Sequence, residues 1–249
     1  MELLPLLIFA ILIVLLLVIY PIWIEQKRRE EREQYYQTEY AIQTQNSYEQ
    51  VMSDEGLLGE FLIYNVLKSM NAPRKFLFNL YLPKWNGGTT ELDVVLLHES
   101  GIYVFESKNY GGWIFGSERQ QYWTQTLPAG RGQSQKHRFY NPILQNNGHL
   151  DRLYQILRPV RFLNGPPPYY SYIVFSNRCE FMDVPRKSGN HYVLHLGELF
   201  LAVQGNVEKA GTRLTATEIE ILYQQLEPYA HASDAVKQAH IENIRLKYY

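Results

Sequence analysis

The sequence is poor in cysteine and in net charge, and both shortages narrow its possible functions. Cys179 is the only cysteine among 249 residues, which excludes an intrachain disulfide and a metal site built from several thiolates. The 24 Lys and Arg side chains nearly balance the 25 Asp and Glu side chains, so the formal net charge is −1. This balance excludes a protein that finds nucleic acid through bulk positive charge.

Familiar catalytic signatures are missing as well. The glycines of the segment 111–116 are not followed by the Lys-Ser/Thr pair of a phosphate-binding loop and indicate turns instead. His191 and His195 are four residues apart, but the Glu of a zinc-binding helix is lacking and the surrounding pattern is strand-like. No evident general base accompanies Cys179, so the sequence gives no support for a thiol nucleophile.

Charge is absent from residues 3–24, which are almost all Leu, Ile and other apolar side chains. As a helix with a rise of ~1.5 Å per residue, this run reaches about 33 Å and can cross a bilayer core of ~30 Å. Tyr20 and Trp23 lie where an interfacial aromatic belt is expected. The run therefore predicts a single membrane-spanning helix.

The flanking charges predict the orientation of this helix. Four basic side chains follow between residues 27 and 32, whereas the short N-terminal side has none. The positive-inside rule then predicts an outside N-terminus and a cytoplasmic C-terminal domain, which suits an unpaired cysteine. A cleaved signal peptide is the competing interpretation, but it fits poorly because a basic n-region and an A-x-A site are missing and the run is too long.

The chain beyond the predicted span divides into three parts. Residues 25–55 are a polar juxtamembrane stalk that can continue the membrane helix, and they show no sustained apolar heptad. Residues 56–229 have a globular pattern, and residues 230–249 are expected to form a C-terminal helical tail. The stalk or the membrane helix could also serve oligomerisation.

The globular part alternates helix and strand patterns. A helix is expected from a Ser53 or Asp54 cap to about Met70, and another begins at Asn141-Pro142 after a polar loop over about 124–140. Strands are expected in KFLFNLYL, ELDVVLL, IYVFESK, GGWIFG, SYIVFS and HYVLHL, and further helices near 198–204 and in LTATEIEILYQQL. This order predicts an α/β fold with a mixed sheet.

Charged residues interrupt two strands that are otherwise apolar on both faces. The segment ELDVVLLHESGIYVFESKN, residues 91–109, predicts a buried hairpin at the centre of a sheet. If its turn is centred on Glu99-Ser100, Asp93 lies opposite Glu106 and Glu91 lies opposite Lys108, all on one face.

Two facing carboxylates about 5 Å apart are destabilising unless a proton or cation lies between them. A hard divalent cation takes oxygen ligands of this kind and keeps several waters. Lys108 would then orient or activate a water, or stabilise charge on an attacked phosphate. The alternative is an ordinary ion-pair patch in which Lys108 neutralises Glu91 and Glu106, and a shift of register by one residue would also undo the facing pair.

The arrangement D-(x)n-E-x-K on adjacent strands resembles the PD-(D/E)XK nuclease superfamily. Within it, the chain is similar to the nuclease-related domain (NERD) family from about Gly56 to about Tyr229. The segments that carry the resemblance are GLLGEF, GGTTELDVVLL, GIYVFESKNYGGWIFG, Trp123 and NPILQNNGHL. The resemblance implies a restriction-endonuclease-like mixed-sheet α/β core.

The resemblance also implies roles for individual residues. Asp93 and Glu106 would be metal ligands, Lys108 the catalytic lysine, and Glu60 the superfamily's helix-borne acid. Leu92 replaces the proline that the family commonly shows before the aspartate, which leaves the metal geometry open. The Ser107 carbonyl remains a further candidate ligand.

Two helical polar residues can be placed by periodicity. Glu60 shares a helix face with Ile63, Tyr64 and Leu67, so it either contacts a metal-bound water or Lys108, or bonds a backbone amide at the rim. Gln145 lies on a stripe with His149 and Arg152 that either lines a substrate groove or is solvated.

A basic-aromatic segment lies in the predicted polar loop. Its members are Arg131, Lys136, His137, Arg138, Phe139 and Tyr140. Such a segment can contact phosphates and stack bases, and it can equally be a solvated loop.

These patterns favour a membrane-anchored, metal-dependent nuclease that hydrolyses DNA phosphodiester bonds with Mg²⁺ or Mn²⁺. The catalytic set would be Glu60, Asp93, Glu106, Lys108 and Gln145, with the metal on Asp93 and Glu106. The rival hypothesis is a non-catalytic, membrane-tethered module that keeps the nuclease fold and binds nucleic acid or protein.

Overall fold

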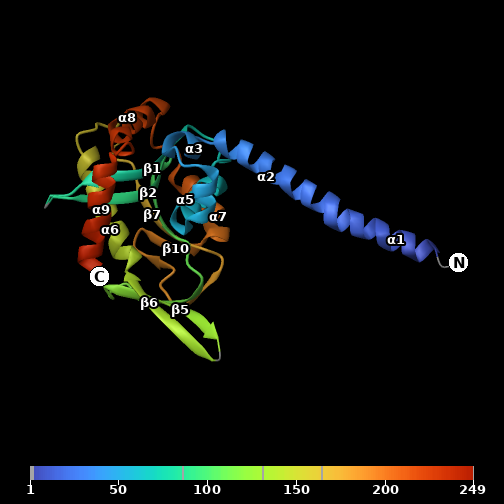
Figure 1. Cartoon of the computed structure of the whole chain (residues 1–249). Coiled ribbons are helices and arrows are strands. Elements are labelled where there is room, and N and C mark those ends of the chain that lie inside the picture. The colour runs from blue at the N-terminus through green and yellow to red at the C-terminus, as the bar shows by residue number, and fades with distance from the viewer. Residues whose placement is uncertain (1–2, 86, 131, 164, 249) are drawn as a thin grey trace. The chain divides into compact units, whose positions relative to one another are not determined.

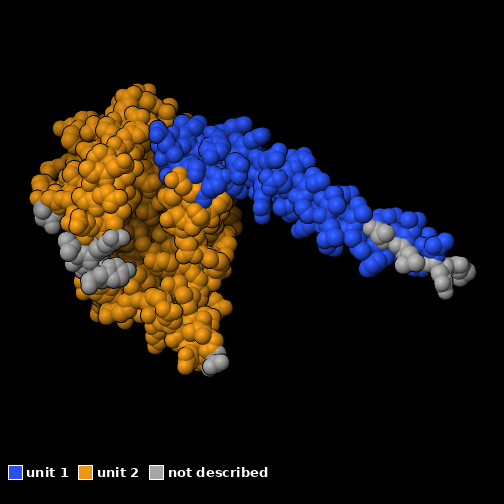
Figure 2. All heavy atoms as spheres, in the orientation of Figure 1, with its two compact units in different colours: residues 1–49 blue, residues 50–249 orange. Residues whose placement is uncertain are grey.

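The computed structural model describes residues 3–85, 87–130, 132–163 and 165–248 (Figure 1). The chain forms two compact units, residues 1–49 and residues 50–249, which Figure 2 distinguishes by colour.

The first unit is dominated by one continuous helix over Leu3–Tyr36. It consists of α1 (Leu3–Val14), a π-helical turn (Leu15–Ile19) and α2 (Tyr20–Tyr36). Among the described residues this is the one helix long and apolar enough to cross a membrane, and a signal sequence would meet the same criteria of length and composition.

The polar part of this unit is less regular than a continuous stalk. The long helix ends at Tyr36, and two short helices follow, α3 (Glu39–Thr44) and α4 (Tyr48–Ser53). Thr38 caps α3 by accepting a hydrogen bond from the Ala41 amide at 3.1 Å. Arg32 also pairs with Glu49 at 2.7 Å, so the chain folds back on α2. The expectation that the whole polar segment extends the membrane helix is therefore wrong beyond Tyr36.

The second unit is a mixed α/β structure with two mixed sheets. It begins with α5 (Glu55–Leu67), whose N-cap is Asp54, one of the two predicted caps. The six strands of the first sheet are β1 (Arg74–Pro83), β2 (Thr89–His98), β3 (Gly101–Lys108), β7 (Tyr169–Phe175), β10 (His191–His195) and β9 (Lys187–Ser188), in that spatial order. β3, β7 and β10 are parallel neighbours, and the other pairs are antiparallel.

The register of the β2–β3 hairpin confirms the sequence prediction. Val94 pairs with Phe105 and His98 pairs with Gly101, so the turn is centred on Glu99-Ser100. The apolar side chains of both strands are fully buried. Continuing the register by one residue sets Asp93 across from Glu106.

The second sheet contains four strands in the order β6, β5, β4, β8. Their bounds are β4 (Gly112–Phe115), β5 (Tyr122–Gly130), β6 (Gln133–Tyr140) and β8 (Cys179–Asp183). β5 and β6 form an antiparallel hairpin that projects from the body of this unit in Figure 1. The predicted polar loop over 124–140 is therefore wrong: its backbone hydrogen bonds are satisfied by strand pairing.

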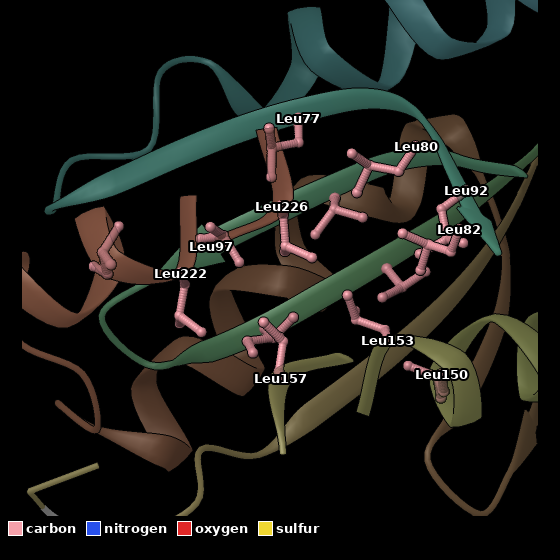
Figure 3. Packing of buried hydrophobic residues seen from close by; sticks show 14 of the residues in the cluster. Leu77, Leu80, Leu82, Leu92, Leu97, Leu150, Leu153, Leu157, Leu222 and Leu226 are labelled. Atoms are coloured by element: carbon pink, nitrogen blue, oxygen red, sulfur yellow. The ribbon is translucent and has the colours of Figure 1, made fainter. Parts of the chain in front are cut away.

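Helices cover both faces of the first sheet. α6 (Pro142–Leu157, with N-cap Asn141) and α8 (Ala216–Leu226) pack against a leucine-rich face of β1, β2 and β3 (Figure 3). On the opposite face the Tyr64 ring of α5 packs edge-on against Phe76 and Phe78. α7 (Leu199–Ala210) follows a 3₁₀ turn at Leu196–Glu198, and α9 (Asp234–Tyr248) follows another at Glu227–Tyr229. The central strands are thus shielded from water on both sides.

Candidate active site

The five predicted site residues come from four elements around the open end of the β2–β3 hairpin. Asp93 lies on β2, and Glu106 and Lys108 lie on β3. Glu60 comes from α5 and Gln145 from α6. The hairpin register, rather than a loop, holds the first three in place.

Lys108 links β3 to α6. Its Nζ donates to Glu106 Oε1 at 2.5 Å and to Gln145 Oε1 at 3.4 Å. The side chains of Lys108 and Glu106 are only 13% and 2% exposed. The ion pair between Lys108 and Glu106 is therefore enclosed, and Gln145 contacts Lys108 from α6.

Asp93 is held by the backbone of the neighbouring strand. Its Oδ2 accepts a hydrogen bond from the Ser107 amide at 2.7 Å. Burial, followed by repulsion from Glu106, raises the pKa of Asp93 to about 8, although Lys108 opposes this shift. The two carboxylates are thus close enough for the charge of one to disfavour ionisation of the other.

Glu106 has one oxygen that the protein does not satisfy. Its Oε2 is buried and has no hydrogen-bond partner among the described residues. His149 Nδ1 lies 3.4 Å from this oxygen and 3.1 Å from Asn146 Oδ1. Burial and the nearby Lys108 lower the pKa of His149 to about 3, so the imidazole is neutral and supplies no counter-charge. The helical periodicity of the sequence placed His149 on one stripe with Gln145 but did not predict its position beside Glu106.

A further carboxylate, Glu91, is surrounded by groups that the sequence analysis did not associate with it. His240 Nε2 of α9 lies 3.5 Å from Glu91 Oε2, and His240 Nδ1 lies 3.0 Å from Thr89 Oγ1. The Tyr81 ring contacts the His240 ring edge-on at 5.4 Å. Burial, the main cause, and the charge of Asp93 raise the pKa of Glu91 to about 7, against a Tyr81 hydrogen bond that lowers it. Glu91 therefore belongs to the same acidic cluster as Asp93.

Glu60 is buried on α5. The residue is 7% exposed, which agrees with the predicted inward face. Burial raises the pKa of Tyr81, and the charges of Glu91, Glu60 and Asp93 raise it further. Gly59 lets α5 approach β3, because a side chain there would collide with Ser107. The glycine before Glu60 thus fixes how close this acid lies to the hairpin.

β1 is distorted directly across from Asp93. The pairs Phe78–Val94 and Leu80–Leu92 flank Asn79, which adopts a left-handed φ of 52°. Its Oδ1 is buried without a hydrogen-bond partner among the described residues. A non-glycine residue in this conformation is uncommon outside turns, and Asn is one of the few side chains that tolerates it. No sequence signal in a strand pattern indicates such a kink.

The other candidates lie apart from this cluster. Lys136, His137 and Arg138 are exposed on β6 of the second sheet, and Arg131 lies outside the described residues. His191 is bonded to Ser171 Oγ at 2.6 Å and to Asn147 Oδ1 at 2.7 Å, so its ring nitrogens are satisfied by the protein.

The donor set fits a hydrated divalent cation. Mg²⁺ is usually held by one or two carboxylates together with waters and substrate phosphates. Asp93 and Glu106 supply two carboxylates, and the unsatisfied Glu106 Oε2 is a buried acceptor that a cation would pair. Across the described parts of the chain, no group of three or more His, Cys, Asp or Glu side chains is arranged to hold a metal. The site therefore matches a two-carboxylate arrangement and not a closed protein cage.

Comparison with known proteins identifies the domain that carries this cluster. Residues 55–176 match the family model NERD, described as a nuclease-related domain. Over 195 residues the chain is 26% identical to an uncharacterized protein of Bacillus anthracis, a match that covers 78% of this chain and 85% of the relative. No solved structure matches the chain. Residues 55–176, which contain Glu60, Asp93, Glu106, Lys108 and Gln145, thus form a nuclease-related domain of the NERD family.

Proposed function

We propose that this protein is a metal-dependent nuclease that hydrolyses phosphodiester bonds of DNA. The observation that carries the proposal is the closeness of the Asp93 and Glu106 carboxylates, together with Glu106 Oε2, which is buried with no hydrogen-bond partner in the part of the chain that the structure describes. The nuclease-related domain over residues 55–176 supports the same reaction class. Hydrolysis of a phosphodiester consumes one water and leaves a phosphomonoester and a hydroxyl group.

Asp93 and Glu106 would hold Mg²⁺ or Mn²⁺ in this proposal. When bound, the cation supplies a more acidic water and positive charge for the phosphate oxygens. The Ser107 amide orients Asp93 through its 2.7 Å hydrogen bond, and the raised pKa of Asp93 gives a cation a reason to bind here. Neutral His149 beside Glu106 leaves the negative charge of this carboxylate for the cation.

The protonation state of Lys108 limits the chemical roles that this side chain can play. Burial, the largest single influence, would lower the pKa of Lys108, but the charges of Glu106, Tyr110 and Asp93 and the hydrogen bond to Glu106 together raise the pKa above its ordinary value. The ammonium group therefore stays charged at neutral pH and cannot accept a proton from water. Of the three roles considered for Lys108, two remain: stabilising charge on the attacked phosphate and orienting the water. Activation of the water by Lys108 as a base is disfavoured.

Gln145 and Glu60 would support this arrangement. Gln145 Oε1 accepts from Lys108 Nζ at 3.4 Å and limits the directions in which the ammonium group can point. Glu60 would add a further acid from α5, next to Gly59, which lets this helix approach Ser107. Both would be positioning residues.

The proposal includes a location for the reaction. The apolar helix that begins at Leu3 is proposed as a single membrane span with an outside N-terminus and a cytoplasmic nuclease-related domain. The basic residues between 27 and 32 favour this orientation. The chain would then act on DNA that lies close to the membrane.

A cleavage assay tests the proposed reaction. The full chain in detergent micelles would be incubated with end-labelled DNA in Mg²⁺, in Mn²⁺ and in EDTA. We expect cleavage only with a cation, and loss of cleavage in Asp93→Asn and Lys108→Ala. The matched controls are Asp151→Asn and Lys209→Ala, which change exposed side chains on α6 and α7. Equal cleavage by the wild type and the two site variants would sink the assignment and favour a non-catalytic binding module.

A further inference from the structure

The four-stranded second sheet has two unlike faces. Its inner face packs into a hydrophobic cluster that includes Ile114, Trp123 and Phe175. Its outer face is formed by the alternate residues of the same strands, because successive side chains of a strand point to opposite sides. The Trp113 and Phe115 side chains there are 38% and 39% exposed.

The pairing registers define what lies on the outer face. Two cross-strand rows run over it, one containing Lys136, Thr126, Trp113 and Glu180 and the next containing Arg138, Thr124, Phe115 and Asp183. Each row begins with a cation on β6, crosses a threonine on β5, reaches an aromatic ring on β4 and ends with an acid on β8. Thr126 is buried between its neighbours at 7% exposure, and the pairing of β4 with β8 shifts in register between Ile114 and Phe115. Because the rows are neighbours, Lys136 lies next to Arg138 on β6, and Trp113 lies next to Phe115 on β4.

Charge on this face changes sign from one edge to the other. Lys136 and Arg138 are exposed on β6, where the Arg138 guanidinium lies 4.9 Å from the centre of the Tyr122 ring. On β8, Glu180 Oε2 accepts a hydrogen bond from the Trp113 indole at 3.2 Å. A polyanion is therefore attracted to the β6 edge and repelled from the β8 edge. The hydrogen bond also holds the indole in one orientation.

We propose that the outer face of the second sheet is a binding platform for single-stranded nucleic acid. The phosphates lie along Lys136 and Arg138, and two bases reach across β5 to stack on Trp113 and Phe115. Stacking needs an open base face, which paired bases in a duplex do not offer, so the ligand is an unpaired strand. The proposal rests on the proposed function in taking nucleic acid as the substrate.

Chain connectivity ties this platform to the hydrolytic site. Trp113 follows Lys108 by five residues, and Tyr140 precedes Gln145 by five. Five residues span at most ~18 Å even when fully extended. A strand held on the sheet is thus close to the elements that carry Asp93, Glu106 and Lys108. The platform would deliver an unpaired segment to the cleavage site.

The test measures binding without cleavage. The full chain in detergent micelles, kept in EDTA, would be titrated into a fluorescein-labelled oligothymidylate of about 12 nucleotides, within the ~4 to 16 nucleotides that a comparable sheet-based site covers. Loss of a stacked base costs about 5- to 150-fold in affinity, so Trp113→Ala and Phe115→Ala should each weaken binding by that factor. Lys136→Gln with Arg138→Gln should make the salt dependence of log affinity less steep by about 1.4, since each phosphate contact on a single strand contributes about 0.7.

Matched control variants show whether a loss of binding is specific to the outer face of the second sheet or follows the removal of any exposed ring or cation. Tyr154→Ala removes an aromatic ring of α6 that is 53% exposed, and Lys68→Gln with Lys209→Gln removes two exposed cations of the helices. These variants should bind as the wild type does. Circular dichroism melting of each variant shows whether the sheet is still folded.

Three outcomes would overturn the proposal that the outer face of the second sheet binds single-stranded nucleic acid. They are no binding of the oligonucleotide by the wild type, wild-type affinity in the double variant of Trp113 and Phe115, and equal affinity for a blunt duplex. The hydrolytic proposal is judged separately by cation-dependent cleavage and by Asp93→Asn, which should bind the oligonucleotide in EDTA but not cut it. Failure of the binding proposal and failure of the hydrolytic proposal therefore give different experimental results.

Discussion

The two sheets of the second unit differ in where they place polar side chains. In the first sheet, β2 and β3 are apolar on both faces, and their charges are concentrated at one enclosed end, at Asp93, Glu106 and Lys108. In the second sheet the inner face is apolar and the charges lie in the open, on Lys136 and Arg138. Enclosed charges strengthen each other's fields and suit chemistry, whereas exposed charges beside rings suit reversible contact with a ligand.

Replacing Trp123 by Ala should cause the largest loss of stability and should show how differently the two faces of the second sheet are packed. Trp123 is fully buried on the inner face of the second sheet, and its indole donates to the Ser117 carbonyl at 3.0 Å. Removing such a ring costs about 3–5 kcal/mol of unfolding free energy. Trp113→Ala on the outer face should cost well under half of this, as measured by chemical denaturation. Equal losses would mean that both faces are packed.

Replacing Lys108 by Ala should lower the rate of cleavage by about 10²–10³, the cost of removing one donor to a developing negative charge. The reason is that Lys108 carries the enclosed positive charge of the first sheet, only 13% exposed. Single-turnover rates with saturating DNA measure this effect. Lys136→Ala removes a cation of the second sheet and serves as the contrast. This change should raise the KM for DNA and leave the maximal rate as in the wild type. A fall in maximal rate comparable to that of Lys108→Ala would mean that the two sheets do not differ in this way.

Replacing Asn79 by Val should destabilise the first sheet by about 1–3 kcal/mol, because a β-branched residue is strained at a positive φ. Asn79→Gly is the matched variant, since glycine adopts the observed φ of 52° without strain. Thermal and urea unfolding of the two variants would show the difference. Similar stability of the two would mean that the kink across from Asp93 is not imposed by the fold.

The most gradual predicted effect concerns pH and His98, at the turn end of β2. Burial and the charge of Arg74 lower the pKa of His98 to about 4, below its ordinary value of 6.5. The unfolded chain therefore binds a proton between pH 6.5 and 4 that the folded chain does not, and stability falls as pH falls through this window, by at most about 1.4 kcal/mol per pH unit.

Urea unfolding from pH 7 to pH 4 measures this slope. His98→Gln should flatten it, whereas His231→Gln, at an exposed histidine, should leave it as in the wild type. An unchanged slope in His98→Gln would place the acid sensitivity elsewhere in the fold.

Much of the first sheet could be predicted because its signals are local. Apolar alternation and the Glu99-Ser100 turn together specified the hairpin register, whose last pair, Val94 and Phe105, directly adjoins Asp93 and Glu106. Residue type alone predicted Ser53 or Asp54 as one helix cap and Asn141 as another, and Asp54 and Asn141 accept the expected backbone hydrogen bonds.

The remaining features depend on distant contacts. The β5–β6 hairpin was missed because QSQKHRFY is exposed along most of its length and shows no apolar alternation. His240 reaches Glu91 from the far end of the chain, and Asn79 takes its conformation from the strands around it. Side chains brought together by tertiary packing leave no pattern in a single sequence.

Calorimetric titration of the full chain with Mn²⁺ asks whether Asp93 and Glu106 hold a cation at all. We expect saturable binding near one equivalent in the wild type, loss of that binding in Asp93→Asn and Glu106→Gln, and its retention in Asp151→Asn. Wild-type binding that persists unchanged in Asp93→Asn and Glu106→Gln, or a wild type that binds no Mn²⁺ while remaining folded, would contradict this expectation.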